Sequence, residues 1–201
     1  FLFVGRANDP IKRFDLVRDT LIKIKDGIKK IKVCGAENPN FGNYLGYVSD
    51  EELNNLYNST QFVLLPSKAE GIGLPMIESM ICGALPITCS DNETAKEFLP
   101  PDFICEPNAQ SILDKIEELN KEYDAKRKLA LEYGKKYGTI TAVIQKNKFE
   151  ITSLREDQNQ KGRSTDIIFT NDWSKDALRR DFTFNAMYMT PFGKITDYFF
   201  A

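Results

Sequence analysis

Short apolar runs alternate with amphipathic runs from Phe1 to Lys136, and this alternation limits the fold more than any other feature of the chain. The apolar runs are bounded by Gly, Pro or Ser, as buried strands of parallel sheets commonly are. The predicted strands cover residues 1–5, 30–34, 61–65, 85–89 and 103–105. Strands separated by helical segments predict an α/β fold, in which helices cover a parallel sheet.

Helical patterns lie between the predicted strands. An apolar stripe over residues 14–24 predicts a crossover helix that ends at Gly27. Ser49 and Glu52 have the spacing of a capping box, so a second helix is predicted to open at Ser49. A third helix is predicted to begin at Pro75, because proline suits a first helical turn, and to stop at Gly83.

The pattern changes after the charged segment 111–136, which predicts one or two helices. Segments 139–144 and 149–154 flank a turn and predict an antiparallel hairpin. We therefore predict two domains, residues 1–136 and 137–201, with no flexible linker between them.

Charge and composition limit the chemistry that this chain can perform. The 27 basic and 29 acidic side chains give a net charge of −2, so no net field favours nucleic acid or an anionic membrane. The chain has no histidine, which removes the commonest general base and metal ligand, and we predict no metal site. The four cysteines lack zinc-site spacing and are expected to be mainly buried thiols in a reducing cytoplasm.

The apolar runs and the start of the chain bear on its cellular location and on its place in a longer protein. No run approaches the roughly 18 apolar residues of a membrane span. The first residue is Phe1, without an initiator methionine or a basic leader. We expect a cytoplasmic chain that is the middle part of a longer protein.

The loops after the predicted strands are the expected place for a ligand in an open parallel sheet. Gly71, Gly73 and Leu74 lie where the third helix opens, so backbone amides there can bind a diphosphate. Arg6 and Lys12 follow the first predicted strand and could stabilise the negative charge of a departing nucleoside diphosphate without a metal. Lys12 also fits a solvated position on an outer helix face.

Two glutamates complete the predicted site. Glu70 lies in the loop and can accept hydrogen bonds from sugar hydroxyls, while Glu78, on the helix behind it, can accept them from a pair of ribose hydroxyls. Two glutamates at this spacing also occur by chance in charged proteins. Their position after a predicted strand and before a helix favours the functional interpretation.

These residues lie in segments that resemble the C-terminal, donor-binding half of retaining, family-4-type GT-B glycosyltransferases. The matching segments are Val4-Gly5-Arg6, Leu45-Gly46-Tyr47-Val48, Leu65-Pro66-Ser67 and the run from Glu70 to Met80. The resemblance covers about residues 1–136 and implies a Rossmann-like sheet, half of a GT-B fold. It implies a nucleotide-sugar donor bound without a cofactor, with Glu70 on the sugar, Glu78 on the ribose, and Arg6 and Lys12 on the phosphates.

The chain departs from this family at three points. Ile72 stands where the motif usually has phenylalanine, and Ser79 where it usually has alanine. The family's N-terminal domain, which binds the acceptor, is absent from this sequence. Transfer by this chain alone is therefore not expected, and the acceptor is unknown.

A second polar string lies in the C-terminal third. Arg179, Arg180, Asp181 and Asn185 are interleaved with phenylalanines, a pattern that suggests a nucleotide pocket in which arginines bind phosphates. A surface salt-bridge cluster is the alternative interpretation of the two arginines.

This region resembles part of the head domain of CCA-adding tRNA nucleotidyltransferases and bacterial poly(A) polymerases, a small α+β fragment. The matching segments are 137–139, 149–155, 179–186 and 192–197. The resemblance implies that ATP or CTP, and tRNA, are partners, and that Glu150 lies near the catalytic acid chemistry. The implied nucleotide contacts are Arg155, Arg179, Arg180, Asp181 and Asn185.

The family's glycine-rich motif and its Asp-x-Asp pair, which binds magnesium, are missing, so Mg²⁺ is expected only if this part were complete. Three hypotheses follow: a nucleotide-sugar-dependent glycosyltransferase domain, an RNA nucleotidyltransferase fragment, and a fused remnant that binds nucleotides without catalysis. The first is favoured because its donor site is complete in the sequence.

Overall fold

The structure is a computed structural model, and it describes residues 1–70, 73–136, 139–144, 147–152, 154–161, 164–180, 186–190 and 192–199. The chain divides into two compact units, residues 1–137 (unit 1) and 138–201 (unit 2). Each unit is described by itself. Among the described residues, no helix has the length and apolar character needed to cross a lipid bilayer.

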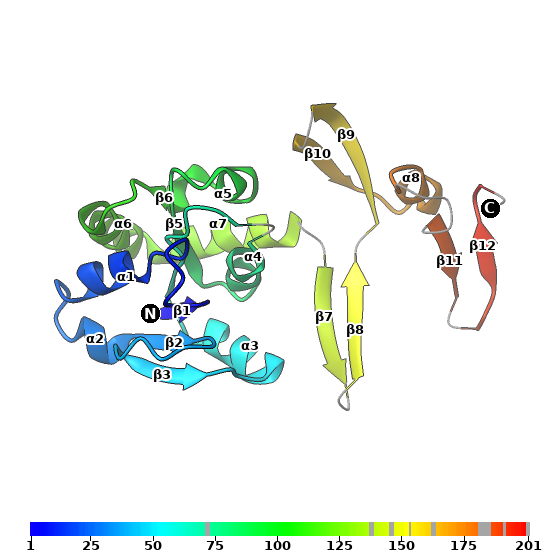
Figure 1. Cartoon of the computed structure of the whole chain (residues 1–201). Helices are drawn as coiled ribbons and strands as arrows, with labels where there is room; N and C mark the ends of the chain where they lie inside the picture. The colour runs from blue at the N-terminus through cyan, green and yellow to red at the C-terminus, as the bar shows by residue number, and fades with distance from the viewer. Residues whose placement is uncertain are drawn as a thin grey trace. The chain divides into compact units, whose positions relative to one another are not determined.

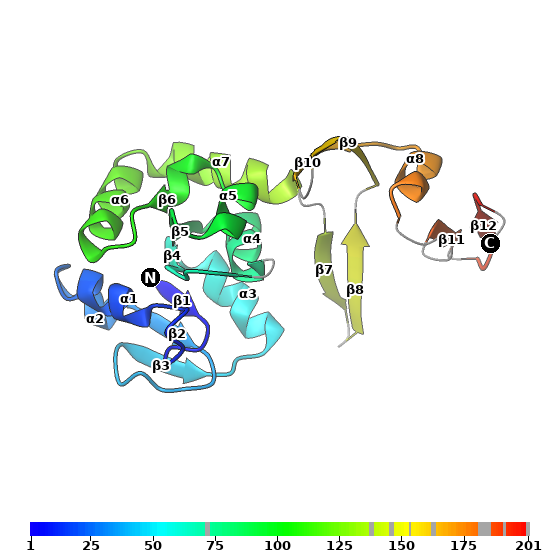
Figure 2. The ribbon, with the colours of Figure 1, turned by 45° about the horizontal axis from the view of Figure 1, so that its top comes forward.

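Unit 1 is built on a six-stranded parallel sheet, whose order is β3-β2-β1-β4-β5-β6 (Figures 1 and 2). The strands are β1 (Leu2–Val4), β2 (Lys32–Cys34), β3 (Asn43–Gly46), β4 (Phe62–Leu64), β5 (Leu85–Cys89) and β6 (Ile104–Cys105). β1 pairs with β2 on one edge and with β4 on the other, so the strand order reverses direction at β1. This reversal is the topological switch point of the sheet.

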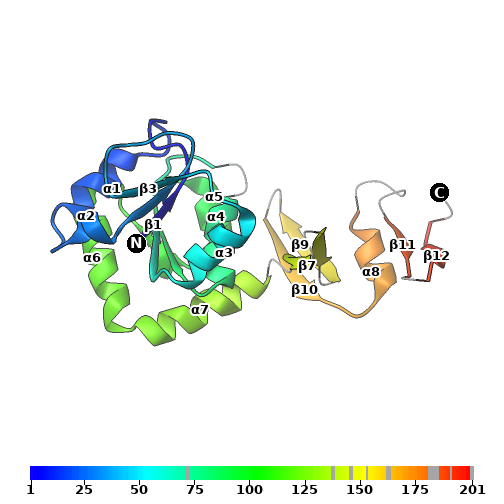
Figure 3. The same cartoon turned by 90° about the horizontal axis from the view of Figure 1, so that it is seen from below.

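Helices cover both faces of this sheet. They are α1 (Phe14–Leu21), α2 (Gly27–Lys30), α3 (Asp50–Asn58), α4 (Leu74–Ile81), α5 (Glu93–Phe98), α6 (Ala109–Lys121) and α7 (Tyr123–Lys136), with a short 3₁₀ turn at Pro101–Phe103. Helices α1 and α6 pack together, and α4 packs against α3 and α7; Figure 3 shows these two groups on opposite sides of the strands. The result is a three-layer α/β unit.

The core of unit 1 lies between these layers. Leu2 and Phe3 on β1, Leu64 on β4 and Leu85 on β5 are fully buried, because a central strand of a parallel sheet is covered on both faces. Helix α7 approaches α4 closely at Gly134, where an added Cβ would lie 2.8 Å from the backbone nitrogen of Ile81. A side chain at Gly134 would force these helices apart.

The structure confirms the predicted α/β fold and the five predicted strands, with shifts of one or two residues at their ends. The capping box is present: the Ser49 side chain accepts from the Glu52 amide, and the Glu52 carboxylate accepts from the Ser49 amide. The predicted helix over 14–27 is wrong in extent. Helix α1 ends at Leu21, and Gly27 begins α2; glycine is required there because an added Cβ would lie 2.4 Å from the Leu21 carbonyl oxygen.

Within its described residues, unit 2 contains three two-stranded antiparallel sheets and the short helix α8. The strands pair as β7 (Thr139–Ile144) with β8 (Asn147–Thr152), β9 (Arg155–Lys161) with β10 (Ser164–Phe169), and β11 (Met187–Met189) with β12 (Ile195–Asp197). The first pair confirms the predicted hairpin. Helix α8 (Trp173–Leu178) opens at Asp172, whose side chain accepts a hydrogen bond from the Ser174 amide.

Candidate functional site

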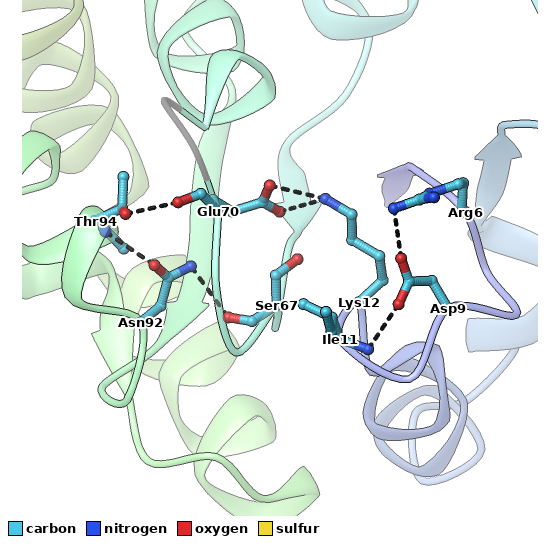
Figure 4. Close-up of polar contacts among 9 residues, drawn as sticks. Arg6, Asp9, Ile11, Lys12, Ser67, Glu70, Asn92 and Thr94 are labelled. Carbon is cyan, nitrogen blue, oxygen red and sulfur yellow. Dashed lines mark hydrogen bonds and ion pairs between the residues drawn. The ribbon is translucent and has the colours of Figure 1, made fainter.

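Lys12 and Glu70 meet at the switch point of the unit 1 sheet. Lys12 lies in the loop after β1 and Glu70 in the loop after β4, and the Lys12 Nζ lies 2.6 Å and 2.8 Å from the two carboxylate oxygens of Glu70 (Figure 4). Both side chains are mostly buried, with exposed fractions of 20% and 15%. Ligands of open α/β sheets bind outside the carboxyl ends of the strands at such a point, so this pair marks the candidate site.

The loop after β1 is held by its own hydrogen bonds. The Asp9 carboxylate accepts from the Ile11 amide and forms an ion pair of 2.6 Å with Arg6 (Figure 4). The Arg6 side chain is 65% exposed. In the structure Arg6 pairs with Asp9 and Lys12 with Glu70, and the binding of phosphate by Arg6 and Lys12 stays a prediction.

The N-terminus of α4 lies just beyond Glu70. Gly73 precedes the helix with φ 67°, a left-handed conformation that favours glycine, and Leu74 is the first helical residue, with a largely exposed side chain. By helix geometry the Leu74 amide has no acceptor within the helix, which is the general basis of anion binding at such an end, whereas Pro75 has no N–H and the Met76 amide donates to the Gly73 carbonyl at 2.8 Å. Gly71, the other predicted glycine, lies outside the described residues.

Glu78 lies one turn into α4 and already has a partner. The Tyr57 hydroxyl donates a hydrogen bond of 3.0 Å to Oε2 of Glu78, and the Tyr57 ring is buried in the core. Burial raises the pKa of Glu78, and the hydrogen bond from Tyr57 acts in the opposite direction. Sequence reasoning did not identify Tyr57 as a neighbour of this carboxylate, because the two residues lie on different helices.

The loop after β5 supports the loop that carries Glu70. The buried Asn92 donates to the Ser67 carbonyl at 3.1 Å, and the Thr94 hydroxyl donates to the Glu70 carbonyl at 2.8 Å (Figure 4). The Ser67 side chain is 1% exposed, and its hydroxyl has no hydrogen-bond partner within the described part of the chain. Because buried hydroxyls are normally paired, Ser67 offers a free polar group close to Lys12 and Glu70.

Unit 2 has a different polar centre, at Asp176 on α8. Its fully buried carboxylate accepts hydrogen bonds from the Arg155 amide and from the side chains of Arg179, Arg180 and Tyr188, at 2.6–3.0 Å. Burial alone would raise the pKa of Asp176, but the hydrogen bonds from Tyr188 and the other donors together lower it well below its usual range. The pKa of Tyr188 is raised to about 12, first by burial and then by the hydrogen bond to Asp176.

The predicted nucleotide contacts of unit 2 lie around this centre or outside the described residues. Arg179 and Arg180 are joined through Asp176, and the Arg155 backbone reaches the same carboxylate. Asp181 and Asn185 lie outside the described residues, as does the Glu150 side chain. The sequence carried no signal for Asp176, since a helical aspartate is normally solvated.

No group of three or more side chains of the types that bind metals comes together within the described ranges. All four cysteines are free thiols: Cys34, Cys89 and Cys105 are buried, and Cys82 is partly exposed. The described residues thus form one polar centre in each unit: Lys12 and Glu70 in unit 1, and Asp176 with its partners in unit 2.

Comparison with known proteins identifies the class of each part. The sequence model of "Glycosyl transferases group 1" matches residues 35–137, about half of the chain, and the chain belongs to this family. A second model, "Poly A polymerase head domain", matches residues 105–200. The two matches overlap at 105–137, a segment that contains α6 and α7 of unit 1.

Individual relatives show the same division. The chain is 50% identical over 66 residues to human mitochondrial CCA tRNA nucleotidyltransferase 1, covering 33% of this chain and 15% of that protein. It is 41% identical over 66 residues to O-antigen chain mannosyltransferase B of Escherichia coli, covering 32% and 17%. The chain thus spans less than a fifth of each of these relatives.

Among solved structures, Anabaena Alr3699/HepE in complex with UDP and glucose has a similar fold. The TM-score is 0.56 with 16% identity, over 67% of this chain and 42% of that protein. This likeness agrees with the glycosyltransferase-like, GT-B half-domain architecture of unit 1.

Proposed function

We propose that unit 1 binds the diphosphate and sugar of a nucleotide-sugar donor at the Lys12–Glu70 centre. The observation that carries this proposal is the meeting of a cation and a carboxylate, from loops 58 residues apart, at the switch point of the sheet. A diphosphate would replace Glu70 as the partner of the Lys12 ammonium group. Sugar hydroxyls would then donate to Glu70, so that both charges keep a partner when their own ion pair opens.

Three further features support this proposal. The N-terminus of α4, which begins at Leu74 with a backbone amide that lacks an intrahelical acceptor, follows Glu70 closely in the chain, and a phosphate there would be stabilised by the helix dipole. Oε2 of Glu78 accepts from Tyr57, which leaves Oε1 for a ribose hydroxyl. HepE was solved with UDP and glucose, which makes uridine donors the first to test.

In a complete enzyme, this half would serve retaining transfer. The acceptor hydroxyl would attack the face from which the diphosphate leaves, and Lys12, together with Arg6 released from Asp9, would stabilise the developing negative charge. No metal is needed for that stabilisation. The acceptor would be supplied by a second domain, so we expect donor binding without transfer by this chain.

Calorimetric titration with UDP, GDP and ADP tests donor binding. We expect one of the three to bind, and Lys12→Gln and Glu78→Ala each to weaken it by about 1–3 kcal/mol, the scale of a charged hydrogen bond. Lys121→Gln, at the exposed last residue of α6, is the control and should leave the affinity unchanged. If wild-type protein binds none of them more tightly than about 1 mM, or about −4 kcal/mol, the proposal is wrong.

A second candidate function belongs to unit 2, and the observation that favours it is the 50% identity to the human CCA-adding enzyme over 66 residues. Unit 2 would bind the phosphates of ATP or CTP, and those of tRNA, through Arg179 and Arg180. Titration with ATP and CTP in the presence of Mg²⁺ tests it, with Arg180→Ala as the variant. Triphosphate binding that survives this substitution would remove the assignment.

The two units would then be parts of two unrelated proteins joined near residue 137, each with its own ligand. Limited proteolysis tests this interpretation, since cleavage near residue 137 should leave residues 1–136 intact and still able to bind the diphosphate. If neither diphosphates nor triphosphates bind, a fused remnant without catalysis is the better interpretation.

A further inference from the structure

The loop after β5 touches both loops that form the Lys12–Glu70 centre. Asn92 of this loop donates to the Ser67 carbonyl, and Thr94, in the first turn of α5 just beyond the loop, donates to the Glu70 carbonyl. The loop after β5 reaches the Lys12 loop through Asp91, whose carboxylate oxygens lie 2.9 Å and 2.6 Å from the two terminal nitrogens of Arg13. The loops after β1, β4 and β5, three neighbouring strands of the sheet, are therefore joined to one another by these contacts.

Arg13 occupies an unusual backbone position. It has φ 50° and ψ 48°, in the left-handed region, and it precedes α1 without a side-chain capping hydrogen bond. A residue other than glycine costs energy in this conformation, so its persistence here needs a compensating contact. The two-pronged ion pair with Asp91 is such a contact, because the guanidinium group matches a carboxylate in shape and charge.

The backbone conformation at Arg13 sets the position of Lys12, the residue before it. The Lys12 amide donates to the Asp9 carbonyl, and the Ile11 carbonyl accepts from the Lys68 amide at 2.8 Å. The Lys12 loop is thus tied to Asp91 at one end and to the Glu70 loop at the other. The loop after β5 is itself anchored in the fold by Asn92. This residue is fully buried and also caps α5 by accepting a hydrogen bond from the Ala95 amide.

We infer that Arg13, Asp91 and Thr94 are positioning residues, which hold the loops of Lys12 and Glu70 next to each other so that one diphosphate sugar can bind both side chains. None of the three has to touch the ligand. The effect of these residues on affinity rests on the proposed donor binding, whereas their effect on the two loops needs no ligand.

The double variant Arg13→Gln/Asp91→Asn tests the inference, since it keeps the net charge and the backbone strain while it removes the ion pair. Lys126→Gln/Asp102→Asn is the matched control, because Asp102 and Asp91 have nearly equal exposed fractions, 32% and 34%, and each pairs with one cation. For the hydroxyl, Thr94→Val is compared with Thr20→Val, which also removes a hydroxyl bonded to a backbone carbonyl.

The first measurement is UDP affinity by calorimetry. The double variant at 13 and 91 should weaken UDP binding by about tenfold, and Thr94→Val by about fivefold, on the scale of one charged or neutral hydrogen bond. In a Lys12→Ala background the double variant should change affinity by less than about twofold, because its effect is exerted through Lys12. An effect that persists in full in that background would show a general loss of structure and overturn the inference.

The second measurement needs no ligand. Amide hydrogen exchange on the full chain should become faster at Lys12 and Lys68 in the double variant, and stay unchanged at α6. If wild-type protein does not bind UDP, GDP or ADP, the proposed function fails, and exchange alone decides the positioning role. Unchanged exchange at both amides would overturn that role even if UDP binds.

Discussion

The two polar centres of this chain are assembled in opposite ways. Lys12 and Glu70 come from loops 58 residues apart and meet only because β1 and β4 are neighbours in the sheet. Three of the four described donors around Asp176 lie within twelve residues of it along the chain: Arg179 and Arg180 directly after α8, and Tyr188 on β11. A centre of the first kind depends on the pairing of distant strands, and one of the second kind depends mainly on residues that follow its own helix.

The two centres also differ in the balance of charge. Lys12 and Glu70 are one cation and one anion, so a ligand that carries both phosphates and hydroxyls can replace each partner. Asp176 has two arginines on a single carboxylate, which leaves a surplus of positive charge. The first centre is suited to opening around a ligand, and the second to staying closed while it presents its arginines.

The largest effect is expected from Asp176→Ala. The substitution leaves the donors of Arg179, Arg180 and Tyr188 without their shared acceptor, and loss of one partner of a buried ion pair costs about 3–5 kcal/mol. Amide exchange in β9, β10 and α8 measures the change in the free energy of opening of unit 2. A cost below about 1 kcal/mol would mean that Asp176 is not the centre of this unit.

Acid should affect the two units differently. The pKa of Asp176 is lowered in the folded state, so its contribution to stability is present above the unfolded pKa of about 4 and is lost as the pH falls further. We expect unit 2 to lose about 2 kcal/mol between pH 4 and pH 2 through this group. Asp176→Asn should flatten this part of the profile, measured by amide exchange; an unchanged profile would contradict the assignment.

A smaller effect is expected for the pair in unit 1. A double-mutant cycle with Lys12→Gln and Glu70→Gln should give a coupling energy of about 1 kcal/mol in denaturant unfolding, because the pair is partly solvated. The coupling should shrink in 0.5 M salt. A coupling energy of about 3–5 kcal/mol, as large as the expected cost of Asp176→Ala, would remove the contrast between a centre that opens around a ligand and one that stays closed.

The smallest effect is expected for Glu78→Gln. Burial raises the pKa of Glu78 in the folded state, so wild-type stability falls as the pH rises through the window above the unfolded pKa of about 4. The glutamine variant lacks this charge and still offers Tyr57 an acceptor. We expect it to gain about 0.5 kcal/mol at pH 7 and nothing at pH 4, in thermal unfolding; a loss at pH 7 would contradict this.

Much of unit 1 could be predicted because its strands are apolar on both sides and its helices carry clear start signals, such as Ser49 with Glu52. The edge strand β3 was missed, since its residues alternate between partly buried and exposed and it lacks an apolar run. Helix α5 was missed because its six residues are too few for a periodic stripe. Edge and short elements depend on neighbours that a local pattern does not reveal.

The candidate residues were predicted better than their contacts. Lys12 and Glu70 lie on loops after strands, as predicted, whereas their mutual ion pair depends on the pairing of β1 with β4. Asp176 was not predicted, since two of its hydrogen-bond partners, Tyr188 and the Arg155 amide, lie on the strands β11 and β9 and not on its own helix. Their roles in binding a ligand remain proposals for the experiments above.

The position of β1 in the sheet also bears on how the chain is made. Leu2 pairs with Val63, so one edge of the central strand stays without its partner until the ribosome has synthesised β4. Until then this fully apolar strand presents unpaired backbone groups to other nascent chains. Slowing translation between β3 and β4 should therefore increase aggregation, whereas a pause after β6 should not.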